Sequence, residues 1–372
     1  MKLQYLSVLV SAMVIAGNAI GAELYNKDGN KLELLGKLNG IRHMSSDDSK
    51  NGDRSSFHYG FNGEARLGDG IIGFGSWKQE IGLNQGGKGG IKNSFSGLDF
   101  AGLKFSDSST IDYGRNSGVL YDIGAWTDVM PQFGGDTTIS DNFMTGRANS
   151  VFTYRNSNFF GMLDGLNFAL QYQGKNEIGR SISEANGDGY GLSVTYNFSN
   201  GLSAGTAYTS SNRTLSQQQY SLNRLDSKKD NKDKRAEAYS FGVKYDANNC
   251  YLAALYSETH NMTPYGIVGE KEKSGSGGFA DMAYNFEFVA QYALDFGLRP
   301  SIGYLQSRID GDDQGRSQTI KKYIEVGATY NFNKNMLTFV DYRINLLDKK
   351  NFIRNTQIST DNILSMGMTY MF

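Results

Sequence analysis

The side chains that most often carry out catalysis are few in this chain of 372 residues. A hydrolytic site needs a nucleophile or an activated water molecule, with a base oriented beside it. The sequence has three histidines, His43, His58 and His260, and none of them lies in a recognisable catalytic signature. It contains no His-Glu-x-x-His pattern, the pattern that binds zinc on a helix. We therefore predict that the protein is not an enzyme and holds neither metal nor cofactor.

A period of two dominates the hydrophobic pattern over most of the chain. Residues 324–332 place an apolar side chain at every even position and a polar side chain or glycine at every odd position. Residues 189–198, 239–245 and 364–372 show the same alternation. Because successive side chains of a strand point to opposite faces, each segment predicts a strand with one apolar face and one polar face.

Two environments fit such strands: a soluble antiparallel sheet packed on a core, and a membrane β-barrel with lipid outside and water inside. Mean hydropathy is only −0.45, although 13% of the residues are aromatic. No long helix is visible that could cover a sheet, and aromatic residues recur at segment ends, as they do in the girdles of membrane barrels. A barrel needs only every second strand residue to be apolar. We therefore predict an all-β fold, a transmembrane antiparallel β-barrel.

Sixteen such strands can be counted, an even number as in bacterial barrels. They are predicted to start near residues 30, 56, 72, 94, 110, 150, 166, 188, 202, 236, 250, 281, 298, 322, 336 and 362. Short turns such as 199–201 and 333–335 alternate with long polar connections such as 210–235 and 260–278. Short turns on one side and long loops on the other are typical of the bacterial outer membrane, where the long loops face outward.

The N-terminus has the features of a targeting segment. Met1 and Lys2 give a positive start, Leu6–Ala16 is apolar, and residues 19–21 form a small-residue cleavage site. We predict a signal peptide over residues 1–21, cleaved after Gly21, and a single barrel domain over residues 22–372. The alternative is a membrane anchor, for which the apolar run is short.

Several stretches carry a family resemblance that covers the mature chain from end to end. They are Ala22–Lys31, Tyr113–Asn116, Pro131–Asp136 (Pro-Gln-Phe-Gly-Gly-Asp, one change from a Pro-Glu-Phe-Gly-Gly-Asp loop motif), Tyr154–Gly161, Phe296–Ile302 and the C-terminal Phe372. Together they resemble the enterobacterial general porins, the trimeric, non-specific diffusion channels of Gram-negative outer membranes. The resemblance implies passive diffusion of small hydrophilic solutes and ions. It also implies a 16-stranded barrel in a homotrimer, with the third long loop folded inward.

In such porins, acidic residues on the inward loop face basic residues on the opposite wall. The resemblance therefore implies a pore constriction in this chain, with Lys78 where the family has a wall glutamate, Gln132 where it has a loop glutamate, and His58 where it usually has arginine. The residues assigned to the constriction are Lys37, His58, Lys78, Tyr121, Asp128, Gln132, Asp136 and Arg147.

Opposed charges across a narrow passage create a transverse field that biases ion selectivity. Gln132, His58 and Gly97 stand where the family usually carries charges, so we expect a weaker field and a wider passage. An alternative is that Asp128 and Asp136 are ordinary loop residues, since aspartate is common in turns. His58 could likewise be a histidine in the pore wall without a special task.

Three further assignments concern partners. Arg115 matches a residue that latches a neighbouring subunit's second loop, although that loop here, residues 85–90, is short and lacks an acid. Phe372 resembles the signal read by the barrel-assembly machinery, or is simply the end of a closing strand. The mixed charge run Lys228–Arg235 could contact anionic lipopolysaccharide or be a solvated loop. Net charge is −1 and gives no indication of a nucleic-acid partner.

Alternative functions predict different sequence features. An enzyme would need the catalytic signature that the histidines lack. A substrate-specific sugar channel would line its pore with aromatic residues, and Trp126 lies in the loop expected to fold inward. A soluble β-barrel carrier would be much shorter. We favour a non-specific channel.

Overall fold

The computed structural model describes residues 21–68, 70–84, 94–106, 108–222, 235–266, 268, 277–310 and 316–372. Most of the predicted signal peptide, the whole of segment 85–90 and residues 228–234 of the charge run lie outside these described residues.

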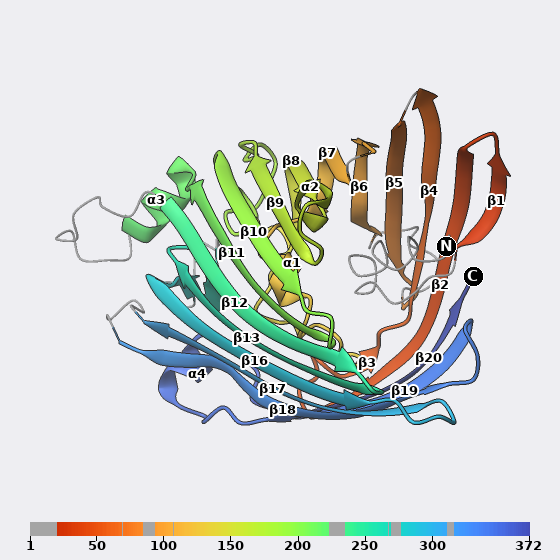
Figure 1. Ribbon diagram of the computed structural model, residues 1–372. Coiled ribbons are helices and arrows are strands. Elements are labelled where there is room, and N and C mark those ends of the chain that lie inside the picture. The colour runs from red at the N-terminus through yellow and green to blue at the C-terminus, as the bar shows by residue number, and fades with distance from the viewer. Residues whose placement is uncertain are drawn as a thin grey trace.

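Sixteen strands form one closed antiparallel sheet, in which each strand pairs with the next and the last pairs with the first (Figure 1). They are β2 (Asn30–Met44), β4 (Ser56–Gly68), β5 (Ile71–Gly82), β6 (Ser94–Lys104), β7 (Ser109–Ser117), β8 (Arg147–Asn156), β9 (Leu166–Gln173), β10 (Gly189–Asn197), β11 (Leu202–Asn212), β12 (Arg235–Ala247), β13 (Cys250–His260), β16 (Met282–Tyr292), β17 (Leu298–Asp310), β18 (Gln318–Asn331), β19 (Met336–Asn345) and β20 (Ile363–Met371). Each predicted strand start lies within four residues of an observed one. The predicted 16-stranded barrel is therefore confirmed.

The remaining elements are short. Strand β1 (Ala22–Lys27) and strand β3 (Gly52–Asp53) pair with β2, and β14 (Pro264–Gly266) pairs with β15 (Gly277–Phe279). The helices are α1 (Tyr121–Gly124), α2 (Asn158–Gly161), α3 (Leu215–Leu222) and α4 (Asn351–Asn355). In the described ranges, no helix has the length and apolar character needed to cross a membrane.

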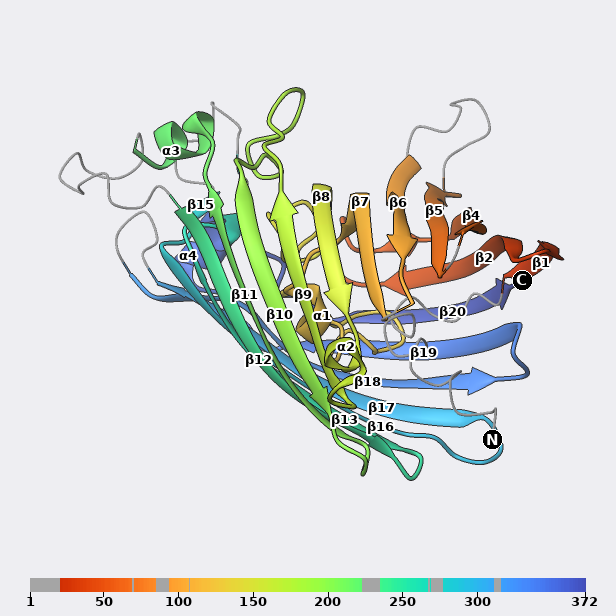
Figure 2. The ribbon, with the colours of Figure 1, turned by 45° about the horizontal axis from the view of Figure 1, so that its top comes forward.

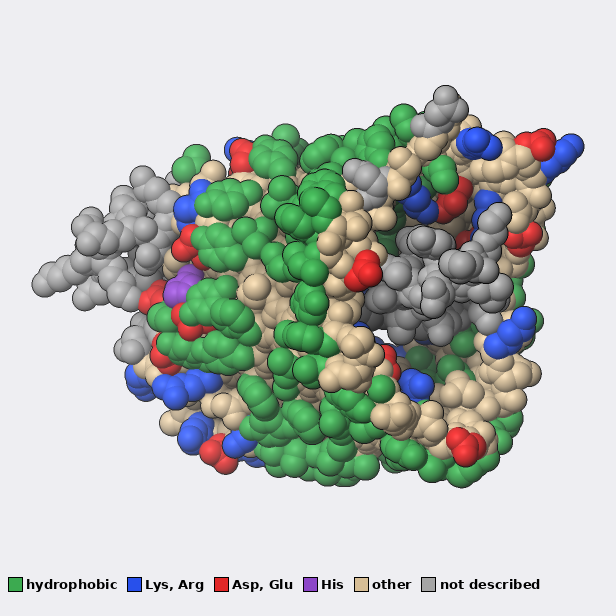
Figure 3. Space-filling view, in the orientation of Figure 1, with side chains coloured by type: hydrophobic (Ala, Val, Ile, Leu, Met, Phe, Trp, Pro, Cys, Tyr) green, Lys and Arg blue, Asp and Glu red, His purple; other side chains and the backbone are tan. Residues whose placement is uncertain are grey.

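The polarity of the barrel wall is the reverse of that in a soluble protein. On β12, the Phe241 side chain is 56% exposed, whereas its neighbour Ser240, which points inward, is 1% exposed. Hydrophobic side chains cover much of the outer face in Figure 3, and charged side chains gather mainly toward its left and right edges. An apolar band outside and polar residues inside are the arrangement that a lipid-embedded barrel requires. The alternative of a soluble sheet is therefore wrong.

The barrel closes where the two ends of the chain meet. Beyond the end of β20, the backbone N–H of Phe372 donates to the carbonyl of Gly36, and the Gly36 N–H donates to the Phe372 carbonyl, both over 3.0 Å. A Cβ atom at position 36 would lie 2.1 Å from the Phe372 ring, so only glycine leaves room for it. Phe372 therefore completes the seam between β20 and β2.

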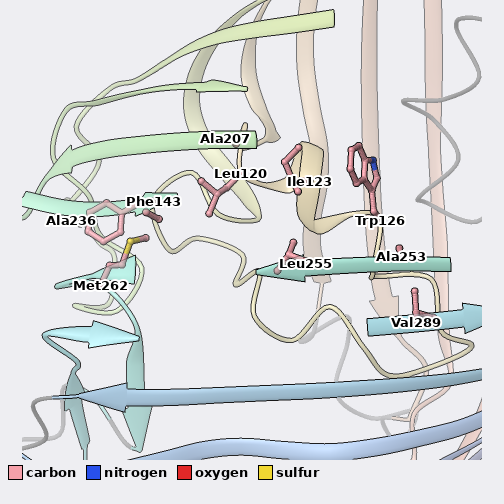
Figure 4. Close-up of a cluster of buried hydrophobic side chains, with 11 residues drawn as sticks. Leu120, Ile123, Trp126, Phe143, Ala207, Ala236, Ala253, Leu255, Met262 and Val289 are labelled. Carbon is pink, nitrogen blue, oxygen red and sulfur yellow. The ribbon is translucent and has the colours of Figure 1, made fainter. Parts of the chain in front are cut away.

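Segment 118–146, which connects β7 to β8, lies inside the barrel rather than outside it. Its helix α1 lies within the ring of strands (Figure 2), and it contacts β11 and β12. Leu120, Ile123 and Trp126 bury their side chains against small and aliphatic residues of the wall, including Ala207 and Leu255 (Figure 4). The predicted inward loop is therefore confirmed, and we call segment 118–146 the inner loop.

Glycines in the wall allow this close approach. A Cβ atom at Gly205 would lie 2.5 Å from Ile123, and one at Gly242 would lie 2.6 Å from the same side chain. The same two positions face Trp126. Larger residues on the inward faces of β11 and β12 would thus displace the inner loop into the lumen.

Candidate functional site

A buried glutamate on β16 fastens the middle of the inner loop. Glu287 is 2% exposed, and its carboxylate accepts hydrogen bonds from the hydroxyls of Thr127 and Thr137. The backbone N–H of Thr137 donates to the same carboxylate over 3.1 Å. One wall side chain thereby binds two points of the loop that are ten residues apart.

Polar side chains of strands on either side of β16 also hold the loop. The Asp341 carboxylate on β19 accepts the backbone N–H groups of Gln132 and Phe133 over 3.0 and 3.2 Å. On β13, the Tyr251 hydroxyl donates to the carbonyl of Trp126 over 2.6 Å. The inner loop is therefore attached to β13, β16 and β19, and the lumen remains between it and the opposite wall.

Asp136 belongs to this attachment. The Tyr323 hydroxyl donates to its carboxylate over 2.9 Å, and the Arg343 guanidinium lies 3.6 Å from it. The Lys321 amine also donates to its backbone carbonyl. The guanidinium of Arg343 in addition lies 4.9 Å from the centre of the Phe133 ring, a cation–π contact with the loop. The structure thus places Asp136 against β18 and β19, on the side to which the loop is fastened.

Asp128 is an acid of the inner loop that is oriented by a neighbouring tyrosine. The Tyr121 hydroxyl donates to its carboxylate over 2.6 Å, so Tyr121 orients it. Burial raises the pKa of the Asp128 carboxyl, whereas this hydrogen bond and the positive charge of Arg147 act in the opposite direction. The carboxyl is therefore within electrostatic reach of Arg147, and also of Asp136.

On the facing wall, two predicted residues and one that was not predicted lie on adjacent strands. Lys37 on β2 is directly opposite His58 on β4, and His58 is directly opposite Glu80 on β5. The His58 Nε2 atom lies 3.7 Å from a Glu80 carboxylate oxygen. Leu38, the neighbour of Lys37, is 45% exposed on the outer face, so alternation directs Lys37 and the residues opposite it inward. Glu80 was not among the predicted site residues.

Lys78 lies on β5, opposite Gly60 of β4, at a β-bulge between β5 and β6. A Cβ atom at Gly97 would be 3.0 Å from the Lys78 Cβ. Gly97, at the position where the family usually carries arginine, therefore lies directly beside the basic side chain of Lys78. Arg147, the first residue of β8, is exposed. Gln132 contributes its backbone N–H to the attachment at Asp341.

Arg115 is engaged within its own chain. Its guanidinium donates two hydrogen bonds to Asp141 at the end of the inner loop, over 2.6 and 2.9 Å. Arg180, from the connection between β9 and β10, lies 2.8 Å from the same carboxylate. Burial by itself would raise the pKa of Asp141, but the two guanidinium groups hold it below its usual value. The predicted partner segment, residues 85–90, lies outside the described residues.

Neither tryptophan lines the pore, as the aromatic residues of a sugar-specific channel would. Trp126 is 6% exposed and packs against the wall, while Trp77 is 42% exposed on the outer face and stacks on Phe61. One Gly-x-Ser-x-Gly spacing does occur, at Gly201–Gly205. However, its serine lies on β11 and donates to Asn197, and the segment lacks the strand–turn–helix geometry of a nucleophile elbow. In the part of the chain that the structure describes, no group of three or more His, Cys, Asp or Glu residues could hold a metal ion.

The residues that fasten the inner loop were missed at the sequence level. Glu287 and Asp341 are acids on inward faces, each between two side chains that face outward. On β16, an acid within an otherwise uncharged inward face was the only local signal, and on β19 the acid shares its inward face with Arg343. Nothing in the sequence indicated which part of the chain, about 150 to 210 residues away, would bind Glu287 and Asp341.

A closed barrel with an apolar exterior, a polar interior and a loop fastened to the inside of its wall defines a membrane channel. The family model of the Gram-negative porins matches residues 27–372. Over the full length of both chains, the sequence is 50% identical to outer membrane protein F of Serratia marcescens and 51% identical to outer membrane porin C of Enterobacter cloacae. The solved structure of Salmonella typhi OmpF in complex with daunomycin is 42% identical, with a TM-score of 0.84, and the match covers 94% of this chain and 100% of that one.

The chain therefore belongs to the Gram-negative porin family. It is a protein of the outer membrane, which it crosses with strands, and it forms a channel for passive diffusion of small hydrophilic solutes and ions. It is a channel and not an enzyme.

Proposed function

We propose that the constriction of this porin lies between the Tyr121–Asp128 pair of the inner loop and a basic wall formed by Lys37, His58, Lys78 and Arg147. The observation that supports this most strongly is the attachment of the loop to the opposite side of the barrel by Glu287 and Asp341. With the loop fastened there, solutes must pass between its free side and β2, β4, β5 and β8.

The charges at this constriction favour weak selectivity. Gln132 is neutral, and Asp136 is paired with Arg343 on the attached side. The basic wall contains its own carboxylate, Glu80, beside His58. Opposed unit charges in a narrow passage would create a strong transverse field. Here fewer charges face each other, so small ions and uncharged solutes should both pass with little discrimination.

Swelling of liposomes that contain the purified protein tests this proposal. With pentoses, hexoses, disaccharides and trisaccharides as osmolytes, we expect the rate to fall steadily with solute size and to rise linearly with concentration. Liposomes without protein are the control. Uptake that saturates at low concentration, or that favours one sugar over smaller ones, would show a dedicated binding site instead.

We also propose that the working unit is a homotrimer and that the signal peptide is cleaved after Gly21. Support for the trimer comes from family membership. Cross-linking of the purified protein in detergent should give a species of three chains, and N-terminal sequencing should start at Ala22.

Two further partners belong to the proposal. We propose that the barrel-assembly machinery recognises the C-terminal segment ending in Phe372, because this residue seals the seam on Gly36. Deletion of Phe372 should slow assembly in cells more than it lowers the stability of protein that has already folded. Lipopolysaccharide is the expected neighbour of the outward loops, and the run Lys228–Arg235 is our candidate contact. Neutralisation of its lysines should weaken lipopolysaccharide retention during purification.

A further inference from the structure

We propose that His58 is a specificity-determining residue of the pore wall, and that protonation of its imidazole lowers the potassium-to-chloride permeability ratio of the channel. The inference rests on the constriction proposed above and adds a dependence on pH to it. Histidine is the side chain whose charge ordinarily changes between pH 5 and pH 8, whereas arginine stays charged throughout.

His58 lies in the middle of the basic wall. Lys37 faces it from β2, and Glu80 faces it from β5 with 3.7 Å between Nε2 and the carboxylate oxygen. The Ser56 hydroxyl lies 3.1 Å from the same nitrogen. Lys78 lies on β5, two residues before Glu80. Arg147 of β8 is within electrostatic reach of His58.

These neighbours determine what one additional proton does. With His58 neutral, the wall carries the positive charges of Lys37, Lys78 and Arg147 and the negative charge of Glu80. Its net charge is then plus two, and protonation of His58 raises it to plus three. The added charge is on an inward-facing side chain in a passage bounded by protein, where the potential is screened less than at an open surface.

The Glu80 carboxylate beside His58 stabilises the protonated imidazole. Glu80 is directly opposite in the β4–β5 register, so a protonated imidazole has an ion-pair partner without any rearrangement of the barrel. The positive charges of Lys37, Lys78 and Arg147 oppose this protonation. The structure thus places His58 among groups of both signs, as a titratable centre between them.

Reversal potentials in a planar bilayer under a KCl gradient test the proposal. Wild-type channels are compared with His58→Asn and His58→Arg at pH 8.0 and pH 5.5. Carboxylates that titrate in this range are common to all three channels. We expect the potassium-to-chloride permeability ratio of the wild type to fall about threefold more than that of His58→Asn on acidification. His58→Arg should show the low ratio at both pH values. If His58→Asn fails to assemble, His58→Gln replaces it.

The outcomes separate the two proposals. If His58→Arg and His58→Asn differ at pH 8.0 but the wild type follows His58→Asn at both pH values, the constriction stands and the charge switch is refuted. If the two variants do not differ at any pH, His58 does not face the ion path. Both the switch and the proposed position of the constriction would then be overturned.

Discussion

Replacement of Glu287 by alanine removes the side chain that binds the inner loop at two points. Three donors then lose their acceptor: the hydroxyls of Thr127 and Thr137 and the backbone N–H of Thr137. A buried donor left without a partner costs about 1–3 kcal/mol. Water that enters from the lumen can replace part of the loss. We therefore expect the free energy that holds the loop on the wall to fall by about 2–4 kcal/mol.

The remaining contacts of the loop with Asp341, Tyr251 and Tyr323 should keep it inside the barrel but allow it to move. The expected result is larger open-channel current noise and more frequent brief closures in single-channel recordings, with a nearly unchanged barrel melting temperature. Glu287→Gln is the matched control, because it keeps the volume and one acceptor oxygen and should stay close to the wild type. Equal noise in the alanine and glutamine channels would refute the claim that Glu287 fastens the loop.

Other perturbations test separate parts of the site. Gln132→Glu adds a carboxylate to the inner loop and should raise the potassium-to-chloride permeability ratio about two- to threefold; an unchanged reversal potential would place this side chain away from the ion path. Gly205→Val would place atoms within 2.9 Å of Trp126. We expect the free energy of unfolding to fall by about 1–3 kcal/mol and the conductance to be lower. An unaltered conductance would contradict the packing described. Because the pKa of Asp141 is held below its usual value, the stability it contributes is present above about pH 4 and lost as pH falls through the lowered value. Residues 174–188 should therefore resist proteolysis at pH 5 in the wild type but not in Asp141→Asn, and equal cleavage of the two proteins at pH 5 would contradict this.

The strands could be predicted from sequence because lipid and water impose opposite demands on alternating residues. The outward side chains of β18, such as Val326, must be apolar, and the inward ones must be small or polar. This rule is local, so a single segment carries it. The largest differences in strand start are at β8 and β18, which begin at Arg147 and Gln318, within polar stretches where the alternation is weak. Pairing with a neighbouring strand extends both of them.

The details of the site could not be predicted in the same way. Asp136 and Asp128 are both acids of one loop, yet Asp136 is held by Tyr323 and Asp128 by Tyr121. Which acid lies against the wall depends on contacts between residues nearly 190 positions apart, and a single sequence does not contain that register. The engagement of Arg115 by Asp141 is a second example, since sequence resemblance suggested a partner in another subunit.

Only part of the charge pattern of the wall could be predicted from the sequence. Lys37, His58 and Lys78 were identified by resemblance, and the β-sheet register places the first two directly opposite each other. Glu80 was missed, although it lies two residues from Lys78 and shares its inward direction. Its proximity to His58 gives the wall a mixture of signs that no list of basic residues would reveal.

The central claim is that the chain forms an open, water-filled and non-specific pore narrowed by its inner loop. Single-channel conductance in a planar bilayer tests it most directly. We expect large, ohmic steps that scale with KCl concentration, close in groups of three equal levels, and are unaffected by micromolar sugars or phosphate. A small conductance that saturates with salt, or a current blocked by one solute at micromolar concentration, would contradict the account and indicate a dedicated transporter.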